Sequence, residues 1–540
     1  MRLISLALLV VVGCSALSAQ VAPGHRLYSP LGVNTSTYLV DDAGVVVHTW
    51  RNTYPVGVSA YLRPNGNLLR TIRTSPGAAG AGGGIQEVAL DGTLVWDYRH
   101  TFAGVRAHHD IEILPNGNVL LIAWVDKSPA EARAAGRDPQ ALGSVFQPDM
   151  IAEIKRTGPT SGAIVWEWHV WDHLIQDLDP NAANYGNVGA HPELIDINFP
   201  PRELAPIEPI GPPASPPPPP TDFNHFNSVS YDPIFDWIII SAHSQSEIWI
   251  IDHSTTTAEA AGHTGGRYGK GGDLLYRWGN PRSYRAGTVA DQKLFFQHSA
   301  KRVPAGYPGA GNITVFNNQI DPASEVWELV LPIDAAGNFS LGAGGAYGPA
   351  GPVWRYAAPG FHSAFMSSCE RLPNGNTLIC SSLQGRAFEV TPAGQVVWQI
   401  APGISFNVTH VKTSLWASAE EVSAGDGGRV AFDLIPGTRH AGQPYFLAGS
   451  MSGTSPGFRL GAYVTPLNVD PYLLNTMGTG LLPGSVGILD TRGRATAAFE
   501  LPSGIAAELA GQRLHHAFLV VDPSTFAVTH MSNPVPLQLR

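Results

Sequence analysis

The sequence predicts an all-β protein: a six-bladed β-propeller followed by a small C-terminal β-sandwich module. Three observations indicate this fold class. One hairpin motif recurs along the chain, and a strand that ends on an aromatic residue recurs after it. The composition is also rich in glycine and proline, with 59 and 45 among 540 residues, which favours many turns and short strands over long helices.

The recurring hairpin is an apolar strand, an Asn-Gly turn and a second apolar strand. Leu-Arg-Pro-Asn-Gly-Asn-Leu-Leu at 62–69 returns as Ile-Leu-Pro-Asn-Gly-Asn-Val-Leu at 113–120 and as Arg-Leu-Pro-Asn-Gly-Asn-Thr-Leu at 371–378. Asn-Gly between apolar runs is the strongest short-range signal for a hairpin. Degenerate copies stand at 231–236 and around 304–316.

The second recurring element is a strand that ends on an aromatic residue, which we expect to pack between neighbouring sheets. Two hairpins per repeat make a four-stranded blade, and blades need neighbours to bury their faces. The copies lie at 87–96, 163–168, 273–278, 353–356 and 395–398.

Counting these repeats gives a propeller over residues 25–415. Five blades are expected at about 57–101, 107–172, 222–281, 294–357 and 361–402. The sixth has an outer pair within Thr37–Trp50, and we expect its inner strands from Ser405–Lys412, which would close the ring with both ends of the segment. A seventh blade would need the insertion at about 172–221, but the consecutive prolines 216–220 predict a loop or polyproline arm there.

Beyond the repeats, residues 420–540 read as short alternating strands separated by turn residues. We interpret them as a separate β-sandwich and assign it no chemistry.

The N-terminus predicts export. Residues 1–19 combine a short positive start with an apolar run too short to span a bilayer, as in a signal peptide cleaved after Ala19. A lipoprotein processed at Cys14 is the alternative. We therefore expect a periplasmic or extracellular protein with no transmembrane segment.

The mature chain keeps two cysteines, Cys369 and Cys380, which flank the third Asn-Gly turn symmetrically. A two-residue hairpin would place them opposite one another, so a cross-strand disulfide is one interpretation. Two small buried residues are the other, because a hydrogen-bonded pair is a poor position for a disulfide.

Charge and motifs exclude several functions. A formal net charge of −10 without clustered Lys and Arg argues against nucleic-acid binding. The glycine-rich runs at 77–84 and 265–272 lack the strand-to-helix context of phosphate-binding loops.

The candidate chemistry lies where the innermost strands begin, because polar residues repeated there converge on the axis of a propeller. Four expected blades start with histidine: His108-His109-Asp110, His225, His298 and His362. Clustered imidazoles suit either metal binding or nucleophilic and acid–base catalysis. The spacing does not separate these two chemistries.

Two segments resemble the bacterial arylsulfotransferase family. His-Phe-Asn-Ser-Val-Ser-Tyr-Asp at 225–232 is similar to its H-x-N-S segment, and Gln297-His298 followed by Thr-Val-Phe-Asn-Asn at 314–318 is similar to its next active-site blade. The stretches 166–177 and 252–280 resemble long signatures of one exported subgroup. The resemblance covers about residues 25–410.

The resemblance implies a nucleotide-independent sulfotransferase that moves a sulfuryl group from an aryl sulfate to a phenol through a sulfated histidine. His225 and His298 match the family's first two active-site histidines, and His362 is the nearest candidate for the third, the nucleophile. The family arginine is absent from 323–327, so Arg302 or Arg386 is the candidate substitute. We expect His109, Asn227, Asn318 and Arg302 to bind the substrate, and we assign no metal and no cofactor.

A second interpretation is a non-catalytic extracellular propeller that binds a ligand or a protein partner. It follows from the missing arginine and the uncertain third histidine. A metalloenzyme and a quinone-dependent dehydrogenase rank below it. Small-molecule aryl sulfates and phenols are the expected partners, and a homodimer is left open.

Overall fold

The computed structural model describes residues 20–74, 80, 82–200, 221–320, 323–478, 482–504 and 507–540. The expected signal segment with Cys14 and the proline run 216–220 lie outside these residues. Antiparallel sheets dominate the described chain, and its α-helices are short. None of these helices is long and apolar enough to cross a membrane. They are α1 (Pro129–Ala134), α2 (Thr257–Ala260) and α3 (Pro471–Gly478).

Six antiparallel sheets precede residue 412, and each contains four strands in up-and-down order, one of them with a fifth short strand. The first sheet is β27 (Ser405–Val411), β1 (His25–Pro30), β2 (Ser36–Val40) and β3 (Val46–Arg51). The second is β4 (Val56–Leu62), β5 (Leu68–Arg73), β6 (Gly83–Val88) and β7 (Leu94–Arg99). The third is β8 (Thr101–Phe102), β9 (Val105–Ile113), β10 (Val119–Val125), β11 (Asp149–Arg156) and β12 (Gly162–His169).

The other three sheets follow in chain order. The fourth is β15 (Phe226–Asp232), β16 (Trp237–Ala242), β17 (Glu247–Asp252) and β18 (Tyr276–Trp278). The fifth is β19 (His298–Arg302), β20 (Ile313–Ile320), β21 (Ala323–Leu329) and β22 (Trp354–Tyr356). The sixth is β23 (Ser368–Arg371), β24 (Thr377–Ser381), β25 (Arg386–Val390) and β26 (Val396–Ile400), and a small parallel pair, β13 (Leu174–Ile175) and β14 (Ile195–Asp196), lies in the insertion.

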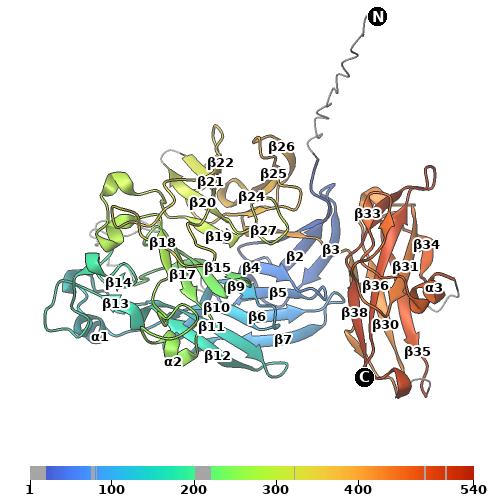
Figure 1. Cartoon of the computed structure of the whole chain (residues 1–540), viewed down its shortest axis with the longest axis horizontal. Helices are drawn as coiled ribbons and strands as arrows, with labels where there is room; N and C mark the ends of the chain where they lie inside the picture. The colour runs from blue at the N-terminus through green and yellow to red at the C-terminus, as the bar shows by residue number, and fades with distance from the viewer. Residues whose placement is uncertain are drawn as a thin grey trace, which may run out of the picture.

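The innermost strands of the six sheets contact one another in a closed cycle. Each one touches the next in the order β27, β4, β9, β15, β19, β23 and back to β27. Figure 1 shows the labels of β4, β9, β15, β19 and β27 gathered in the middle of the larger body, with later strands of the sheets farther out. Residues at the start of each innermost strand are therefore brought to a common region.

The two ends of this segment meet in one sheet. Strand β1 pairs with β27, with Leu27 opposite Thr409, and with β2 on its other side. The expectation that Ser405–Lys412 supplies the inner strands is met only for the innermost strand. The second strand is β1, from the N-terminal end.

The tryptophans that end the fourth strands are buried between neighbouring sheets. Trp96 packs with Ile111 of the next sheet, and Trp168 packs with Phe226. Both indole rings are fully buried, which removes a large apolar area from water at each sheet-to-sheet contact.

The Asn-Gly turns are one residue longer than a two-residue hairpin. In the third copy Arg371 pairs with Thr377, and Gly375 adopts a φ of +89°, which favours glycine. This shifts the register by one residue, so Cys369 faces Ile379 while Cys380 faces Ser368. The disulfide interpretation is therefore wrong, and both cysteines are free and buried.

The same turns form a hydrogen bond to a glutamate on the third strand of their own sheet. The second Asn of the motif donates to that carboxylate, as in Asn67 to Glu87 (2.7 Å) and Asn376 to Glu389 (2.6 Å). Glu389 also accepts from Arg26 Nη2 at 2.6 Å, and both of these side chains are completely buried. Since Arg26 lies on β1, this ion pair joins the N-terminal strand to the last sheet.

Residues after 414 form two sheets with a core of their own. The smaller is β28 (Leu415–Ala417), β30 (Gly428–Leu434) and β35 (Ala495–Leu501). The larger is β29 (Glu421–Val422), β38 (Val535–Leu539), β36 (Arg513–Val521), β31 (Pro444–Ser450) and β34 (Val486–Ile488), with β37 (Val528–Met531) beside β36. A separate pair is β32 (Arg459–Leu460) and β33 (Tyr463–Val464).

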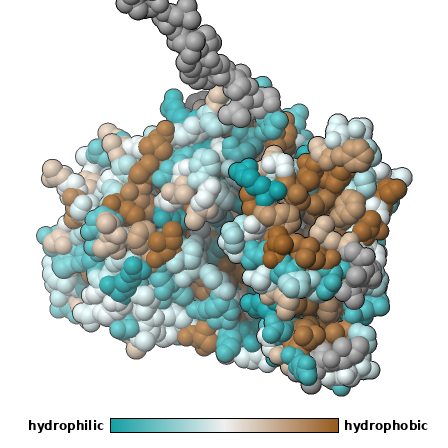
Figure 2. Space-filling model, turned by 45° about the vertical axis from the view of Figure 1, so that its right-hand side comes forward, coloured by the Kyte–Doolittle hydropathy of each residue, from teal (hydrophilic) through white to brown (hydrophobic). Residues whose placement is uncertain are grey.

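This C-terminal part packs beside the first sheet (Figure 1). Asp41 Oδ2 accepts from the backbone N–H of Thr438 at 2.8 Å, and Asp42 pairs with Arg439 at 2.5 Å. Exposed apolar side chains also gather on it, including Val486 and Ile488 of β34. Figure 2 shows apolar patches over the side of the molecule where these strands lie.

The Arg26–Glu389 pair gives the first prediction. Glu389→Gln leaves the Arg26 charge buried without its counter-ion, so we expect the free energy of unfolding to fall by about 3–5 kcal/mol. Urea unfolding monitored by tryptophan fluorescence measures it. The matched control is Glu500→Gln, which removes the exposed pair with Arg429 and should change stability by less than about 1 kcal/mol. Equal effects of the two substitutions would contradict the role of the buried pair.

Candidate active site

The starts of the innermost strands carry unusual backbone conformations as well as histidines. His109 has a φ of +47° and His225 a φ of +53°, and Ser299, next to His298, has a φ of +59°. The strand pairing shifts register at His109 and at Ser299, and two residues after His225, between Phe226 and Ser228. Left-handed non-glycine residues persist only where the surroundings hold them, and they cluster at functional sites. The local geometry thus turns these side chains toward the common region.

Five imidazole rings form a continuous row there, which we call the histidine row. His109 and His225 have ring centroids 4.6 Å apart, and His225 and His243 are separated by 4.8 Å. The row continues to His298 at 5.1 Å from His243, and at its other end His108 lies 5.1 Å from His109. Every one of these residues is buried.

A carboxylate orients His225. Asp222 Oδ2 lies 2.6 Å from His225 Nδ1, and Asp222 Oδ1 accepts from the backbone N–H of His225 at 3.1 Å. Although burial alone would raise it, the charge and hydrogen bond of His225 hold the pKa of Asp222 below its ordinary value. An ionised Asp222 accepts a hydrogen bond from Nδ1–H, so whenever the ring is neutral its lone pair is on Nε2.

A second carboxyl group starts a relay toward His109. Asp149 Oδ1 lies 2.6 Å from His108 Nε2, and His108 Nδ1 lies 2.8 Å from His109 Nδ1. The other oxygen, Asp149 Oδ2, accepts from the backbone N–H of Phe226 at 3.1 Å. Burial, with the charge of Asp222, raises the pKa of Asp149 well above its ordinary value. Asp149 can therefore hold a proton that the buried imidazoles would not keep.

His298 is held by both of its ring nitrogens. Its Nδ1 lies 2.8 Å from Asn318 Oδ1, and its Nε2 accepts from the backbone N–H of Met366 at 3.1 Å. The amide of Asn318 donates to the carbonyls of Ser363 and Met366, each at 2.8 Å, so its oxygen must face the ring. The Nε2 lone pair of His298 is thus already used within the protein.

Burial keeps four rings of this row, those of His108, His109, His243 and His298, uncharged. It lowers the pKa of His108 and of His298 to about 3 and the pKa values of His109 and His243 well below the ordinary range. Neighbouring histidines add to the effect because one charged ring would disfavour another. At neutral pH these side chains are lone-pair donors and N–H donors, not cations.

Aromatic side chains bound the row. Phe406, on the closing strand β27, lies 6.0 Å from the His109 ring and 6.1 Å from the His298 ring. Trp124 stacks on His108 at 4.0 Å. Gly80 also lies against His109, since a Cβ there would stand 1.9 Å from the ring. These contacts contribute to the burial of the row.

Several expected site residues meet at this row and others do not. His109, His225 and His298 belong to it, and Asn318 orients His298. Asn227 is buried beside it and donates to the Gln297 carbonyl at 2.9 Å. Its Oδ1 has no hydrogen-bond partner in the described part of the chain.

The expected convergence of His362 with His225 and His298 is not seen. The His362 side chain is exposed, whereas the row is buried, and no ring contact or hydrogen bond joins it to the row within the described ranges. The six residues that follow it turn back through Met366 and Ser367, both with positive φ, so Met366 and not His362 reaches His298.

The two candidate arginines also lie elsewhere. Arg302 Nε pairs with Asp232 Oδ2 at 2.6 Å, at the far end of β19 from His298. Arg386 lies over the Phe388 ring at 4.3 Å. Neither side chain contacts the histidine row. The row contains His243 instead, and two of its rings pair with Asp222 and Asp149. The sequence signal for these three residues is weak because they do not recur at an equivalent position in each repeat.

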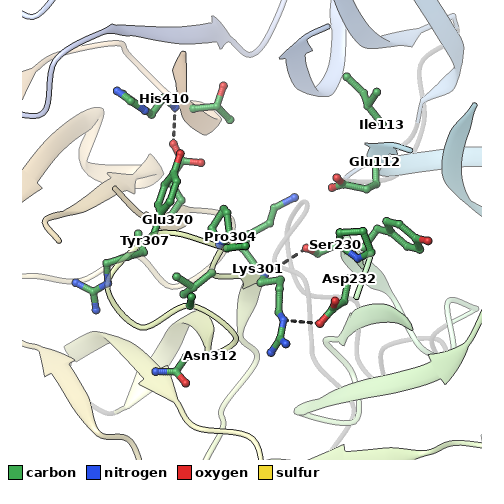
Figure 3. A pocket seen from close by; sticks show the side chains of 18 of the residues that line it. Glu112, Ile113, Ser230, Asp232, Lys301, Pro304, Tyr307, Asn312, Glu370 and His410 are labelled. Carbon is green, nitrogen blue, oxygen red and sulfur yellow. Dashed lines mark hydrogen bonds and ion pairs between the residues drawn. The ribbon is translucent and has the colours of Figure 1, made fainter. Parts of the chain in front are cut away.

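A large cavity opens at the opposite ends of the innermost strands. Its volume is about 1080 Å³, and Arg302 and Lys301 line it together with Glu112 and Glu370 (Figure 3). Lys301 Nζ lies 3.2 Å from Asp110 Oδ2, which places an ion pair between this cavity and the row. Imidazoles thus lie at one end of the innermost strands and mixed charges at the other.

Comparisons with known proteins give one strong match. No curated protein matches the chain. Among solved structures, a protein of unknown function from Bacteroides caccae has 13% identity and a TM-score of 0.39, covering 72% of this chain and 98% of its own. Virginiamycin B lyase from Staphylococcus aureus has 8% identity and a TM-score of 0.33, covering 76% and 92%. These similarities are too weak to support an inference.

The comparison with protein families, in contrast, gives a match over most of the chain. The model described as arylsulfotransferase (ASST) matches residues 24–414, which include all six sheets and the whole histidine row. This match agrees with the resemblance of segments 225–232 and 314–318. The chain belongs to the arylsulfotransferase family.

Proposed function

We propose that this protein is an aryl-sulfate sulfotransferase in which His225 accepts the sulfuryl group from a phenolic sulfate ester and passes it to a phenol. The observation that carries the proposal is the Asp222–His225 pair at 2.6 Å inside the row of neutral imidazoles. Family membership supports sulfotransfer in general. The choice of His225 rests on its pairing with Asp222 through Nδ1, which directs Nε2 away from that carboxylate, whereas the Nε2 of His298 accepts from Met366.

We further propose that the six sheets are the blades of a six-bladed propeller and that residues after 414 form a β-sandwich. The closed cycle of innermost strands and the pairing of β1 with β27 support the propeller. The two sheets around one core support the sandwich.

In the first half-reaction, the His225 Nε2 lone pair attacks sulfur, the N–S bond forms and the S–O bond to the aryl group breaks. The phenolate leaves with that electron pair and takes up a proton. Asp222 keeps Nδ1–H in place and stabilises the positive charge that develops on the ring. His243 Nδ1 is buried without a hydrogen-bond partner in the described residues, so it is available to donate to a sulfuryl oxygen.

In the second half-reaction, the acceptor phenol attacks sulfur and must lose its proton. The relay of Asp149, His108 and His109 takes it at His109 Nε2: His109 passes its Nδ1 proton to His108, and His108 passes its Nε2 proton to Asp149. Neither ring becomes a cation, in agreement with their low pKa values, and the proton ends on a carboxyl group with a raised pKa. The reverse shift returns it to the next leaving phenolate.

The nucleophile is tested by three substitutions with a chromogenic aryl sulfate as donor and phenol as acceptor. His225→Ala should abolish acceptor-dependent turnover, and Asp222→Asn should lower kcat by about 10³–10⁴-fold because the ring loses its orientation. His362→Ala should keep activity. Retained turnover in His225→Ala, or its loss in His362→Ala, would overturn the choice of nucleophile.

The relay predicts different effects on the two half-reactions. With a nitrophenyl sulfate donor, whose phenolate leaves without a proton, Asp149→Asn should keep the pre-steady-state burst of phenolate. Transfer to phenol should slow by about 10²–10⁴-fold, the usual contribution of general acid–base catalysis. Stopped-flow absorbance separates the two. A variant with an unchanged transfer rate would contradict the relay.

The neutral state of the row predicts a pH dependence of stability. His298 titrates near pH 3 in the folded protein and near 6.5 when unfolded, so the unfolded state binds more protons between these values. Stability should therefore fall as the pH is lowered through this window. In urea unfolding at pH 4.5–6, His298→Asn should reduce that slope by about 1.4 kcal/mol per pH unit. Equal slopes in both proteins would show that the ring is charged when folded.

A further inference from the structure

We propose that His173, His263 and Asp273 bind one divalent transition-metal ion of the zinc class, at a site separate from the histidine row. Their ligand atoms lie within 4.8 Å of one another, and no other group of three such side chains in the described residues meets this condition. The proposal is independent of the sulfotransferase function.

The three side chains converge on one oxygen atom. His173 Nδ1 lies 2.9 Å from Asp273 Oδ1, and His263 Nδ1 lies 2.8 Å from the same oxygen. His173 comes from the segment after β12, while His263 and Asp273 come from the loop between β17 and β18. Two imidazoles and a carboxylate are a donor set that zinc takes in proteins.

The hydrogen bonds of His173 leave two acceptor atoms facing one another, an arrangement that a cation between them would stabilise. Its Nε2 lies 2.9 Å from the carbonyl oxygen of Ala260, which can only accept, so the proton of the neutral ring is on Nε2. Nδ1 then presents a lone pair to the carboxylate oxygen of Asp273, which is also an acceptor. Two acceptors at 2.9 Å require a positive charge between them, either a metal ion or an extra proton.

The geometry fits a metal with little movement. In a tetrahedral zinc site with bonds of about 2.0–2.1 Å, neighbouring ligand atoms stand about 3.3 Å apart, so the separations here need to widen by about half an ångström. The His263 side chain is 60% exposed, whereas His173 is fully buried. An ion can therefore reach the site from solvent, and water can supply the remaining ligand.

Neighbouring groups fix the orientation of the His173 ring, as hydrogen-bond partners around a metal site fix a metal-bound imidazole. The Ala260 carbonyl accepts from Nε2, and Trp168 stacks on the ring at 5.3 Å with planes 7° apart. The Trp168 indole N–H donates to the Gly272 carbonyl at 2.7 Å, next to Asp273. Ring orientation and carboxylate position are thus coupled through one tryptophan.

A metal here would join two sequence segments that the histidine row leaves unexplained. The stretches 166–177 and 252–280 supply His173 on one side and His263 with Asp273 on the other. They belong to the third and fourth sheets and pack together through α2 and β12. The ion would fix the loop between β17 and β18 against the neighbouring sheet, a structural role with one open coordination position.

The experiment uses the full chain after removal of metal with a chelator and dialysis. Isothermal titration with Zn²⁺ should show one site per chain, and Co²⁺ in its place should give the intense visible absorption of a tetrahedral centre. His263→Ala changes a mostly exposed side chain, so the fold should survive, and it should weaken Zn²⁺ binding by at least about tenfold. Asp273→Asn should do the same.

The matched control is His191→Ala, which removes another exposed histidine paired with a carboxylate, Glu193. It should bind Zn²⁺ as the unmodified protein does. Absence of a stoichiometric site, or equal binding by His263→Ala and the unmodified protein, would overturn the proposal. The trio would then be three hydrogen-bonded side chains that hold no metal ion.

Discussion

The pairing of β1 with β27 is the constraint on which the proposed active site depends. Residues 25–30 and 405–411 are separated by nearly the whole repeat region, yet they form adjacent strands of one sheet. This pairing brings Phe406 against both His109 and His298, which lie on other sheets. The buried ion pair of Arg26 with Glu389 also links β1 to the last sheet. Fold closure and the shape of the site therefore share one set of contacts.

Burying several adjacent histidines limits how many of them can carry a charge. Five imidazoles in contact cannot all be charged, and burial keeps His108, His109, His243 and His298 neutral. A neutral imidazole is a useful nucleophile only if the correct nitrogen carries the lone pair. Asp222 meets this need for His225, and His108 joins His109 to Asp149. Positive φ values at His109 and His225 are the backbone cost of turning these rings inward.

Part of this architecture could be predicted from the sequence. Repeated hairpins and aromatic-ended strands indicate the sheets because each signal is local. The proximity of His225, His298 and His109 could be predicted because they stand at equivalent positions of the sequence repeat. His362 shares that register in the sequence, but the chain after it turns inward at Met366, which no pattern indicates. Asp222, Asp149 and His243 were missed as site residues because their role depends on contacts across sheets. The pairing register of Cys369 and Cys380 depends on one extra residue in the turn, which the sequence motif does not indicate.

The central claim is that the sulfuryl group rests on His225 between the two half-reactions. The most direct measurement is to mix the enzyme with an aryl sulfate without acceptor, quench it under conditions that preserve N–S bonds, and map the peptides by mass spectrometry. The account predicts an addition of about 80 Da on the peptide and residue His225, lost when phenol is added before quenching. An adduct on His298, His362 or another side chain, or no adduct in an active enzyme, would contradict it.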